Sequence, residues 1–532
     1  MSEHSGAPAA RPWDADDTPA GEPFGPGGWA VGSVSYAVDG LVAGAVGLFV
    51  AEAGAALGSA LGLIGAVATG GSPLLSVGAA VVDLSPKPLK DWAVATFGTG
   101  DKAVLVSVVA IVVTLVLALL GGLARRRPTP ATVGMLALGV VASAAVLTRP
   151  GALLSDVLPT CAGIGLAVVV LRRGTPATDR VGGPTRREAL VVAAGAAGVG
   201  LVTGLRGGAI GGATQDTATA LPTGAPPPVG PQGAQAGIPG SSPWVVPNGD
   251  FYRIDTALVP PRLASAGWSL RVWGEVEREV VLTWEQLLTM PMVDRYVTLC
   301  CVSNEVGGDL VGNALWTGWP VRELLARAGP RAGADMVLSR SADGWTAGTP
   351  LPALTDGRDA LLAVAMNGEP LPREHGFPVR LVVPGLYGYV SATKWVTELK
   401  VTRFAVDMGY WTPRGWSALG PVKTAARIDV PRSGARVTAG RVAVAGVAWA
   451  MHRGIQAVQV RVDDGPWADA RLAAEPTVDA WRQWVYEWDA TAGSHTLTVR
   501  ARDGQGQWQT ADVRPPDPDG ATGLHTVTVT VG

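Results

Sequence analysis

Two adjacent cysteines, Cys300 and Cys301, have the most specific chemistry in this sequence. They follow an apolar β-type run, Tyr296-Val-Thr-Leu, and precede a polar loop that ends at Gly308. This order predicts that a strand ends at the pair and presents a thiol to a cleft. A thiolate there is a soft metal ligand or a nucleophile. The alternative is a buried pair that packs as small hydrophobic side chains, and no CxxC or Cys/His cluster decides between the two.

A longer stretch around the pair, residues 298–325, reads TLCCVSNEVGGDLVGNALWTGWPVRELL. It resembles the cofactor-binding segment of the sulfite oxidase family of molybdopterin enzymes. In that family the cysteine before the Val/Ala-Ser/Gly-Asn step is the protein ligand to molybdenum. The resemblance therefore implies a molybdenum-molybdopterin cofactor and makes Cys301 both the metal ligand and a catalytic residue.

Three further motifs, residues 247–252 (PNGDFY), 375–380 (HGFPVR) and 391–395 (SATKW), resemble cofactor contacts of the same family. In the first, a side-chain amide and aromatic edges hold the pterin; in the second, the first residue and the arginine bind the cofactor phosphate, which suits the planar guanidinium fork. Without the resemblance, the first motif would be interpreted as a surface turn before core aromatics, and the arginine of the second as a solvent-facing residue on a strand. The residues assigned to cofactor binding are Asn248, Phe251, Tyr252, Ser341, His375, Arg380, Ser391, Thr393 and Lys394.

The sequence departs from true sulfite oxidases at two places. Glu305 and Val306 stand where arginines that help bind sulfite are expected, and Trp345 stands at the position of the active-site tyrosine. We assign Trp345 as a catalytic residue by its position. Both changes predict a less cationic pocket, which weakens the case for sulfite as the substrate.

The resemblance predicts a two-electron oxo transfer on a small sulfur- or nitrogen-containing substrate. An S-oxide or N-oxide reductase, for example of methionine sulfoxide, remains an alternative on the same cofactor, because sequence does not show redox direction. A non-catalytic membrane-tethered adhesion module is a third reading, but such a module would not need Cys301, His375 and Arg380 together. A net charge of −2 and the lack of a basic patch argue against nucleic-acid binding.

The composition indicates that one part of this chain of 532 residues lies in lipid and another part in water. Hydrophobic residues make up 48% of it, and 16 of the 19 tryptophans lie after residue 243, whereas the long Ala/Val/Leu/Gly runs lie before residue 207. We therefore expect a disordered tail (1–28), a transmembrane anchor (29–206), an extended linker (207–243), a mixed α+β molybdopterin domain (244–423) and an immunoglobulin-like β-sandwich (424–532).

About five membrane spans are predicted, at residues 41–68, 104–123, 131–148, 151–171 and 189–205. The stretch 72–84 is too short to span and is interpreted as re-entrant or interfacial. Glu52 lies in the first span, where a carboxylate costs roughly 2.5–3.5 kcal/mol on insertion scales; it is either a functional group or one end of a helix–helix hydrogen bond. None of the five histidines lies in a span, so no bis-His haem is expected there. Electrons must then pass through a separate carrier, a cytochrome or a quinone.

The arginines predict the orientation of the anchor. Arg125 to Arg127 and the cluster from Arg172 to Arg187 fall on one side if there are five spans, which predicts that this side is cytoplasmic and that the catalytic domain is extracytoplasmic. Thr185-Arg-Arg-Glu-Ala-Leu190 also resembles a twin-arginine export signal, although flanking charges alone would explain the pair.

From about residue 424 the sequence is typical of an all-β domain. Alternating runs are separated by turns at Asp464-Gly465, Ala492-Gly493 and Asp503-Gly504, at the spacing of a sandwich. The domain resembles the C-terminal dimerisation domain of molybdenum oxidoreductases. Because Trp481, Trp484 and Trp488 follow one another along a single strand, we expect exposed aromatic surface and a homodimer through this domain.

Overall fold

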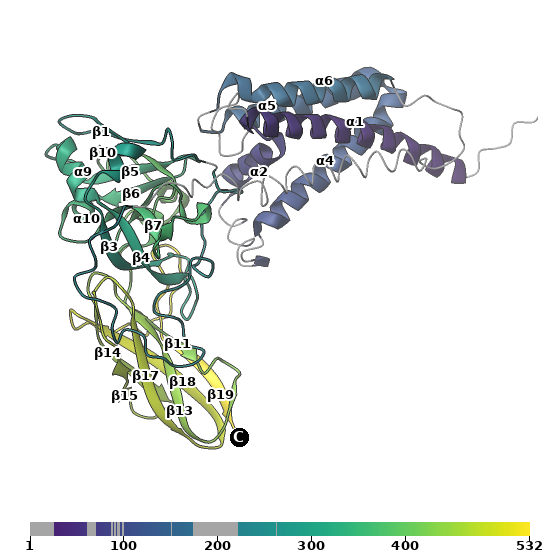
Figure 1. Cartoon of the computed structure of the whole chain (residues 1–532). Helices are drawn as coiled ribbons and strands as arrows, with labels where there is room; N and C mark the ends of the chain where they lie inside the picture. Colours follow the sequence, from purple (N-terminus) through teal and green to yellow (C-terminus); the bar gives the residue numbers. More distant parts are fainter. Residues whose placement is uncertain are drawn as a thin grey trace, which may run out of the picture.

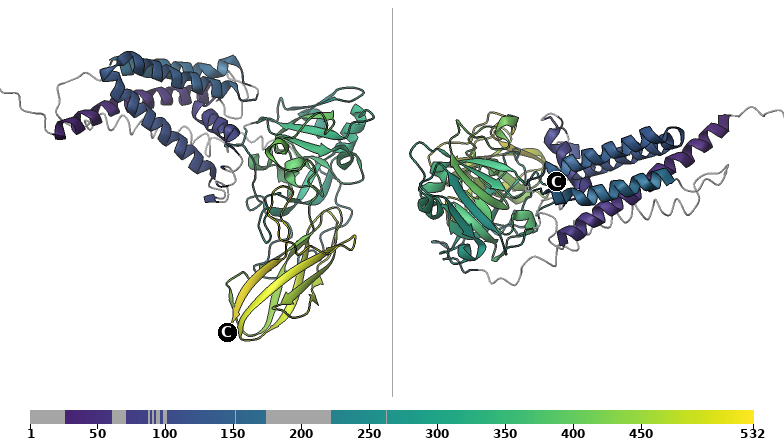
Figure 2. Two further views of the ribbon diagram at one scale, coloured as in Figure 1. Left: turned by 180° about the vertical axis from the view of Figure 1, so that it is seen from behind. Right: turned by 90° about the horizontal axis from the view of Figure 1, so that it is seen from above.

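The structure is a computed structural model that describes residues 26–60, 71–86, 101–150, 152–173, 222–261 and 263–532, together with residues 89, 92, 96 and 97. A helical bundle, a mixed α/β part and a β-sandwich follow one another along these residues (Figure 1). The views from behind and from above show that the helices extend away from one side of the α/β part (Figure 2). The sandwich lies against a different side of the α/β part.

The bundle contains α1 (Pro26–Ala60), α2 (Pro73–Leu84), α4 (Asp101–Arg126), α5 (Pro128–Leu147), the short 3-10 turn η2 (Leu154–Val157) and α6 (Leu158–Arg173). Helix α1 packs along α6 and α4. The α1–α6 approach is close because a Cβ on Gly163 would overlap the carbonyl oxygen of Gly47. Since α1 begins at Pro26, the last three residues assigned to the tail are helical.

Four helical stretches of the described residues are long and apolar enough to cross a membrane: Gly40–Gly58, Val104–Ala124, Pro128–Leu147 and Leu154–Arg172. They coincide with the first four predicted spans, and residues 61–68 of the first lie outside the described residues. The fifth, at 189–205, and the arginine pair before it lie outside the described residues. As expected, 72–84 forms only a short helix, α2.

Glu52 in α1 is fully buried against the start of α2. The Ser72 hydroxyl donates to its carboxylate at 2.8 Å, and the Leu74 N–H donates at 3.2 Å. Ser72 also caps α2 by accepting from the Leu75 N–H. Of the two interpretations of Glu52, this geometry favours the helix–helix hydrogen bond.

The α/β part contains two sheets. The first has the order β2-β1-β10-β5-β6, and the second has the order β3-β4-β7-β8 with β9 also paired to β7. A capping box between Thr283 and Gln286 starts a short helix after β2, as the sequence predicts. The bounds are β1 Ser269–Gly274, β2 Val280–Thr283, α8 Trp284–Leu288, β3 Val293–Cys300, β4 Val311–Pro320, α9 Val321–Ala328, β5 Met336–Ser341, β6 Thr346–Pro350, α10 Leu351–Thr355, β7 Leu361–Met366, β8 Glu369–Pro370, η4 Arg373–His375, β9 Arg380–Val382, η5 Gly388–Val390, β10 Val396–Thr402 and η6 Thr412–Arg414.

The C-terminal part is a sandwich of two sheets, ordered β11-β13-β17-β16 and β12-β19-β18-β14-β15. Buried side chains from both sheets, such as Trp484 and Val499, share one core. The bounds are β11 Ala425–Val430, β12 Arg436–Val437, β13 Gly440–Trp449, β14 Ile455–Val462, β15 Ala468–Asp469, β16 Arg471–Leu472, β17 Arg482–Ala490, β18 Gly493–Asp503 and β19 His525–Val531.

The three tryptophans expected to be exposed are buried within the chain. Trp484 and Trp488 belong to the sandwich core, and Trp481 is buried against Trp244, with each indole N–H donating to the other residue's carbonyl. The expectation of exposed aromatic surface was therefore wrong, because β17 packs on the second sheet and Trp481, just before it, packs on the α/β part. The homodimer itself stays a prediction.

Residues 222–243, which were expected to belong to an extended linker, pack on the folded parts. Ala225 bridges to Val293 at the edge of β3, and Ala234 is fully buried. The Ala236 N–H donates to the Gln483 side chain of the sandwich. This segment therefore ties the two folded parts together.

Candidate functional site

Strand β3 ends at Cys300, so Cys301 is the first residue of the loop that follows, as the sequence predicts. The Cys301 N–H donates to Leu310 O at 2.9 Å, and the Asn304 side chain accepts from the Leu310 N–H at 2.8 Å. These bonds fix the loop at both ends. Cys301 is buried, which raises the pKa of its thiol even though hydrogen bonds from Ser303 and Val302 act against this. A bound metal ion would deprotonate such a thiol.

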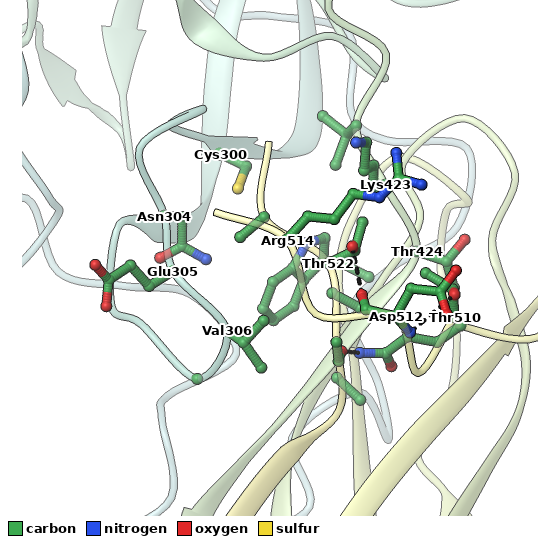
Figure 3. Close-up of a pocket in the computed structure, with 18 of the residues that line it drawn as sticks. Cys300, Asn304, Glu305, Val306, Lys423, Thr424, Thr510, Asp512, Arg514 and Thr522 are labelled. Carbon is green, nitrogen blue, oxygen red and sulfur yellow. Dashed lines mark hydrogen bonds between the residues drawn. The ribbon is translucent and has the colours of Figure 1, made fainter. Parts of the chain in front are cut away.

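The two cysteines lie in different surroundings. Cys300 lines a cavity of about 450 Å³ between the α/β part and the sandwich, whereas Cys301 is not among the lining residues. Figure 3 shows the Cys300 sulfur near Asn304, with Arg514 across the cavity. Strand alternation explains why neighbouring side chains point in different directions.

The wall of this cavity carries both acidic and basic side chains. Glu305 and Val306 line it where arginines were expected, but Lys423, Arg453 and Arg514 line it too. Lys423 pairs with Asp519 at 2.8 Å and Arg453 with Asp503 at 3.0 Å. The basic residues were not anticipated because they lie more than a hundred residues later in the chain. Since Cys301 does not line this cavity, the less cationic pocket around the candidate metal ligand stays a prediction.

Arg380 is a buried cation without an ion pair to any described carboxylate. Its Nη1 donates to His375 O at 3.0 Å, and its guanidinium lies over the Trp316 ring, 4.9 Å from the centroid. Burial lowers its pKa to about 10. The Tyr252 pKa is raised by burial and, next, by the nearby Cys301, while Arg380 acts in the opposite direction. The structure thus brings Tyr252, Cys301 and Arg380 together.

His375 is neutral at pH 7, because burial and the neighbouring Arg380 lower its pKa to about 4. Its Nε2 lies 3.0 Å from Asn248 O. A carbonyl oxygen only accepts, so Nε2 carries the proton and Nδ1 is left as an acceptor. The Phe251 ring packs edge-on against the imidazole at 5.5 Å. This tautomer suits an N–H donor of a pterin better than a phosphate oxygen.

Lys394 is held by a carboxylate that the sequence did not indicate. Its Nζ lies 2.6 Å from Asp255 Oδ2 and donates to Glu374 O at 2.9 Å. Burial lowers the pKa of Lys394 to about 8, although Asp255 acts in the opposite direction. The other Asp255 oxygen lies 2.6 Å from Nζ of Lys102, at the start of α4. No motif surrounds Asp255, and Lys102 lies 153 residues away, so sequence spacing gave no signal.

Four of the residues predicted to contact the cofactor form side-chain hydrogen bonds with other residues of the protein. The Asn248 amide nitrogen donates to Met366 O at 3.2 Å, and its oxygen accepts from Asn367. The Ser391 hydroxyl donates to Tyr387 O at 2.9 Å. Thr393 shares a hydrogen bond with Ser339, and Ser341 donates to Asp343. Their contacts with a cofactor remain predictions.

Trp345 lines a second cavity, of about 260 Å³, between the α/β part and the helices. Its backbone carbonyl accepts from the Ser341 N–H at 2.9 Å. No interaction among the described residues joins Trp345 to Cys301. Its catalytic role also remains a prediction.

A family profile described as "Oxidoreductase molybdopterin binding domain" matches residues 257–411, which include Cys301, His375, Arg380 and Lys394. An uncharacterized oxidoreductase of Bacillus subtilis, YuiH, is 33% identical over 170 residues, which cover 32% of this chain and 82% of that protein. The mitochondrial sulfite oxidases of mouse and human are each 28% identical over 303 residues, 48% of this chain and 55% of theirs. The chain thus spans about half the length of these two relatives.

Among solved structures, the sulfane dehydrogenase SoxCD from Paracoccus pantotrophus matches with a TM-score of 0.48 and 24% sequence identity. The match covers 55% of this chain and 82% of that chain.

Proposed function

Because the chain belongs to the sulfite oxidase family of molybdopterin-dependent oxidoreductases, we propose that it performs a two-electron oxo transfer on a small sulfur- or nitrogen-containing substrate outside the cytoplasmic membrane. It is an oxidoreductase with a molybdenum-molybdopterin cofactor. The observation that carries the proposal is a buried thiol, Cys301, and a buried arginine, Arg380, that both act on the pKa of Tyr252, with no carboxylate among the described residues paired to Arg380.

The residues present fit this cofactor. Burying an unpaired guanidinium is costly, so Arg380 indicates an anionic partner such as a phosphate. Cys301 supplies a soft thiolate for the metal. Lys394 adds a second buried cation, and it is not among the residues that line the cavity beside the sandwich. When bound, the cofactor supplies the oxo-transfer chemistry, while the chain holds it, orients it and sets the charge around it.

The helical bundle supports the proposed location. Arg172 at the end of α6 donates to Thr132 near the start of α5 at 3.2 Å, so this arginine and Arg127, which precedes α5, lie at one end of the bundle. The opposite end carries Lys102 and Arg149 beside the α/β part. By the positive-inside rule, the arginine-rich end is cytoplasmic and the catalytic part faces outward.

The test is a matched pair of cysteine variants. We expect Cys301→Ser in the purified chain to lose turnover and to change the spectroscopic signal of the metal, because the thiolate is removed from the metal. Cys300→Ser should keep the metal signal, since that side chain lies in the separate cavity. Equal molybdenum signals in the wild type and both variants would contradict the assignment.

Direction and substrate need a separate screen. The purified protein would be offered sulfite and thioethers with an artificial electron acceptor, and S-oxides and N-oxides with an artificial donor. Turnover in the first set supports the oxidase, and turnover in the second set supports the reductase alternative. Turnover in neither set, from protein that contains molybdenum, would overturn the proposed substrate class.

A further inference from the structure

The second cavity, which we call the membrane-side cavity, lies where the helical bundle meets the α/β part. Leu75, Ala79 and Val82 of α2 form an apolar wall. Trp345 and Tyr410 line it from the α/β part. Its volume of about 260 Å³ is slightly below the roughly 300 Å³ at which pockets for small ligands begin. It can hold one aromatic ring, with any apolar tail outside it.

Polar groups are also present in the lining. Arg149 pairs with Asp83 at 3.0 Å. The Tyr410 hydroxyl is buried near the Asp83 carboxylate, which, after the larger effect of burial, helps to raise its pKa. An apolar wall with a few hydrogen-bonding groups is typical of sites for small amphipathic ligands.

The membrane-side cavity adjoins the residues assigned to cofactor binding. Asp343 lines it, and its side chain accepts a hydrogen bond from Ser341. Lys394 lies near enough to Asp343 to lower its pKa, although burial, the larger effect, raises it. A ligand in the cavity would therefore lie one layer of side chains from the candidate cofactor site.

We propose that the membrane-side cavity binds the ring of a lipid-soluble quinone, which exchanges electrons with the oxo-transfer reaction. This inference rests on the proposed function. Oxidation of a substrate with oxygen from water releases two electrons and two protons, and a quinone that takes up both pairs becomes a quinol. In the reductase direction, a quinol gives up the same two electrons and two protons while the oxide oxygen leaves as water.

Three observations favour a quinone over other carriers. The cavity is bounded by a short apolar helix, α2, packed beside helices long enough to span a membrane. Quinone carbonyls are acceptors, which suits the Tyr410 hydroxyl and the Arg149 guanidinium as donors. The sequence has no histidine between His4 and His375, so the membrane part contains no bis-His haem that could serve instead.

The experiment measures binding, so it does not depend on turnover. Purified full-length protein in detergent is titrated with a decyl-tailed benzoquinone, and quenching of tryptophan fluorescence is followed. We expect saturable quenching in the wild type. Ala79→Phe should weaken binding at least tenfold because its ring fills the cavity, whereas Ala80→Phe, one position along the same helix and outside the lining, should bind like the wild type.

Tyr410→Phe removes one hydroxyl and should weaken binding about two- to tenfold, as expected for a single hydrogen bond. A photoreactive azido-benzoquinone should label peptides from α2 or the segments around Trp345 and Tyr410. Labelling only elsewhere, or equal affinity in the Ala79 and Ala80 variants, would overturn the proposal. So would displacement of the quinone by a decyl methyl sulfoxide of equal potency, because this would identify a site for apolar chains.

The two proposals fail in different ways. Quinone binding without oxo transfer to or from any substrate in the screen would overturn the proposed function but not the proposed quinone site. Oxo transfer with artificial electron carriers, but no quinone binding, would overturn the proposed quinone site but not the proposed function.

Discussion

Lys394 and Asp255 form a buried ion pair that connects the candidate cofactor site to the helical bundle. The pKa of Lys394 is about 8 in the cofactor-free protein, against an ordinary value of 10.5. Lys394 is therefore charged below pH 8 and loses its proton above it. If its charge helps to hold an anionic cofactor, the affinity for the cofactor should depend on pH in this range.

We expect the affinity of the cofactor-free protein for molybdopterin to fall by up to about tenfold per pH unit above pH 8, because binding then requires uptake of a proton at Lys394. The measurement is molybdenum incorporation during reconstitution between pH 6.5 and 9.5. Lys394→Arg stays charged throughout this range and should remove the dependence. Equal incorporation into the wild type at pH 7 and pH 9.5 would exclude an electrostatic role for Lys394.

Folding stability should change in the opposite direction, so the two effects are separable. The folded-state pKa of Lys394 lies below the unfolded value, so the unfolded chain binds more protons between about pH 8 and 10.5. Stability of the cofactor-free protein due to this group therefore rises with pH across that window. Asp255, whose pKa is lowered by Lys394 and Lys102 against the larger effect of burial, contributes stability that is lost as the solution becomes strongly acidic.

At the residue scale, the sequence predicted the local motifs but not the distant residues that their side chains contact. Cys301 was placed at a strand end because an apolar run before a polar loop is a local signal. Asp255 and Arg514 were missed because their importance comes from contacts with residues far away in the chain. The internal hydrogen bonds of the Asn248 amide were equally invisible, since Asn367 lies 119 residues later.

At the scale of elements, Trp481, the residue before β17, joins the sandwich to the α/β part. The Trp481 N–H donates to the Thr298 hydroxyl at 2.8 Å, and Thr298 lies in β3, two residues before Cys300. The Trp481 indole donates to Trp244 O at 2.9 Å. These bonds support the strand that presents the candidate metal ligand.

We expect Trp481→Ala to destabilise the protein by about 3–5 kcal/mol, as is typical for truncation of a buried tryptophan. Its melting temperature should fall, and molybdenum content should fall with it, since β3 loses a supporting contact. Trp508→Ala, at a residue that is 36% exposed, is the control and should have a smaller effect. A Trp481 variant as stable as the control would show that the junction does not support β3.

Local signals predicted elements well, and packing between elements poorly. The capping box at Thr283 and the turn at Asp464-Gly465 require only neighbouring residues, and both lie where expected. The burial of Trp481 and the docking of residues 222–243 depend on a second domain, which periodicity does not describe. A Gly/Pro-rich segment is predicted as a free linker because it lacks an apolar stripe, although a fully buried Ala234 shows that it packs.

At the scale of the whole molecule, the catalytic part lies at one end of the helical bundle (Figure 1). Lys102 reaches Asp255 from the start of α4, and Arg149 lies beside the membrane-side cavity. The arginine-rich helix ends lie at the opposite end. The four described apolar helices lie where the sequence predicts spans, because hydropathy is a local signal.

The proposed export of the catalytic part raises a separate question, because molybdopterin is assembled in the cytoplasm and is expected to lie deep within the fold. A domain that must fold around its cofactor first has to cross the membrane already folded. The twin-arginine route permits this, and threading of an unfolded chain does not. Arg186 and Arg187, which precede the predicted fifth span, resemble the signal for that route.

We expect the double substitution Arg186→Lys with Arg187→Lys to keep every topology charge and yet leave the catalytic part inside the cell, because an export system that recognises arginine itself would no longer recognise the pair. Protease protection in spheroplasts measures this through cleavage of residues beyond 206. Arg172→Lys with Arg173→Lys makes the same change at another arginine pair on the predicted cytoplasmic side and should not alter exposure. If the Arg186 and Arg187 variant is cleaved as readily as the wild type, the two arginines act only as topology charges.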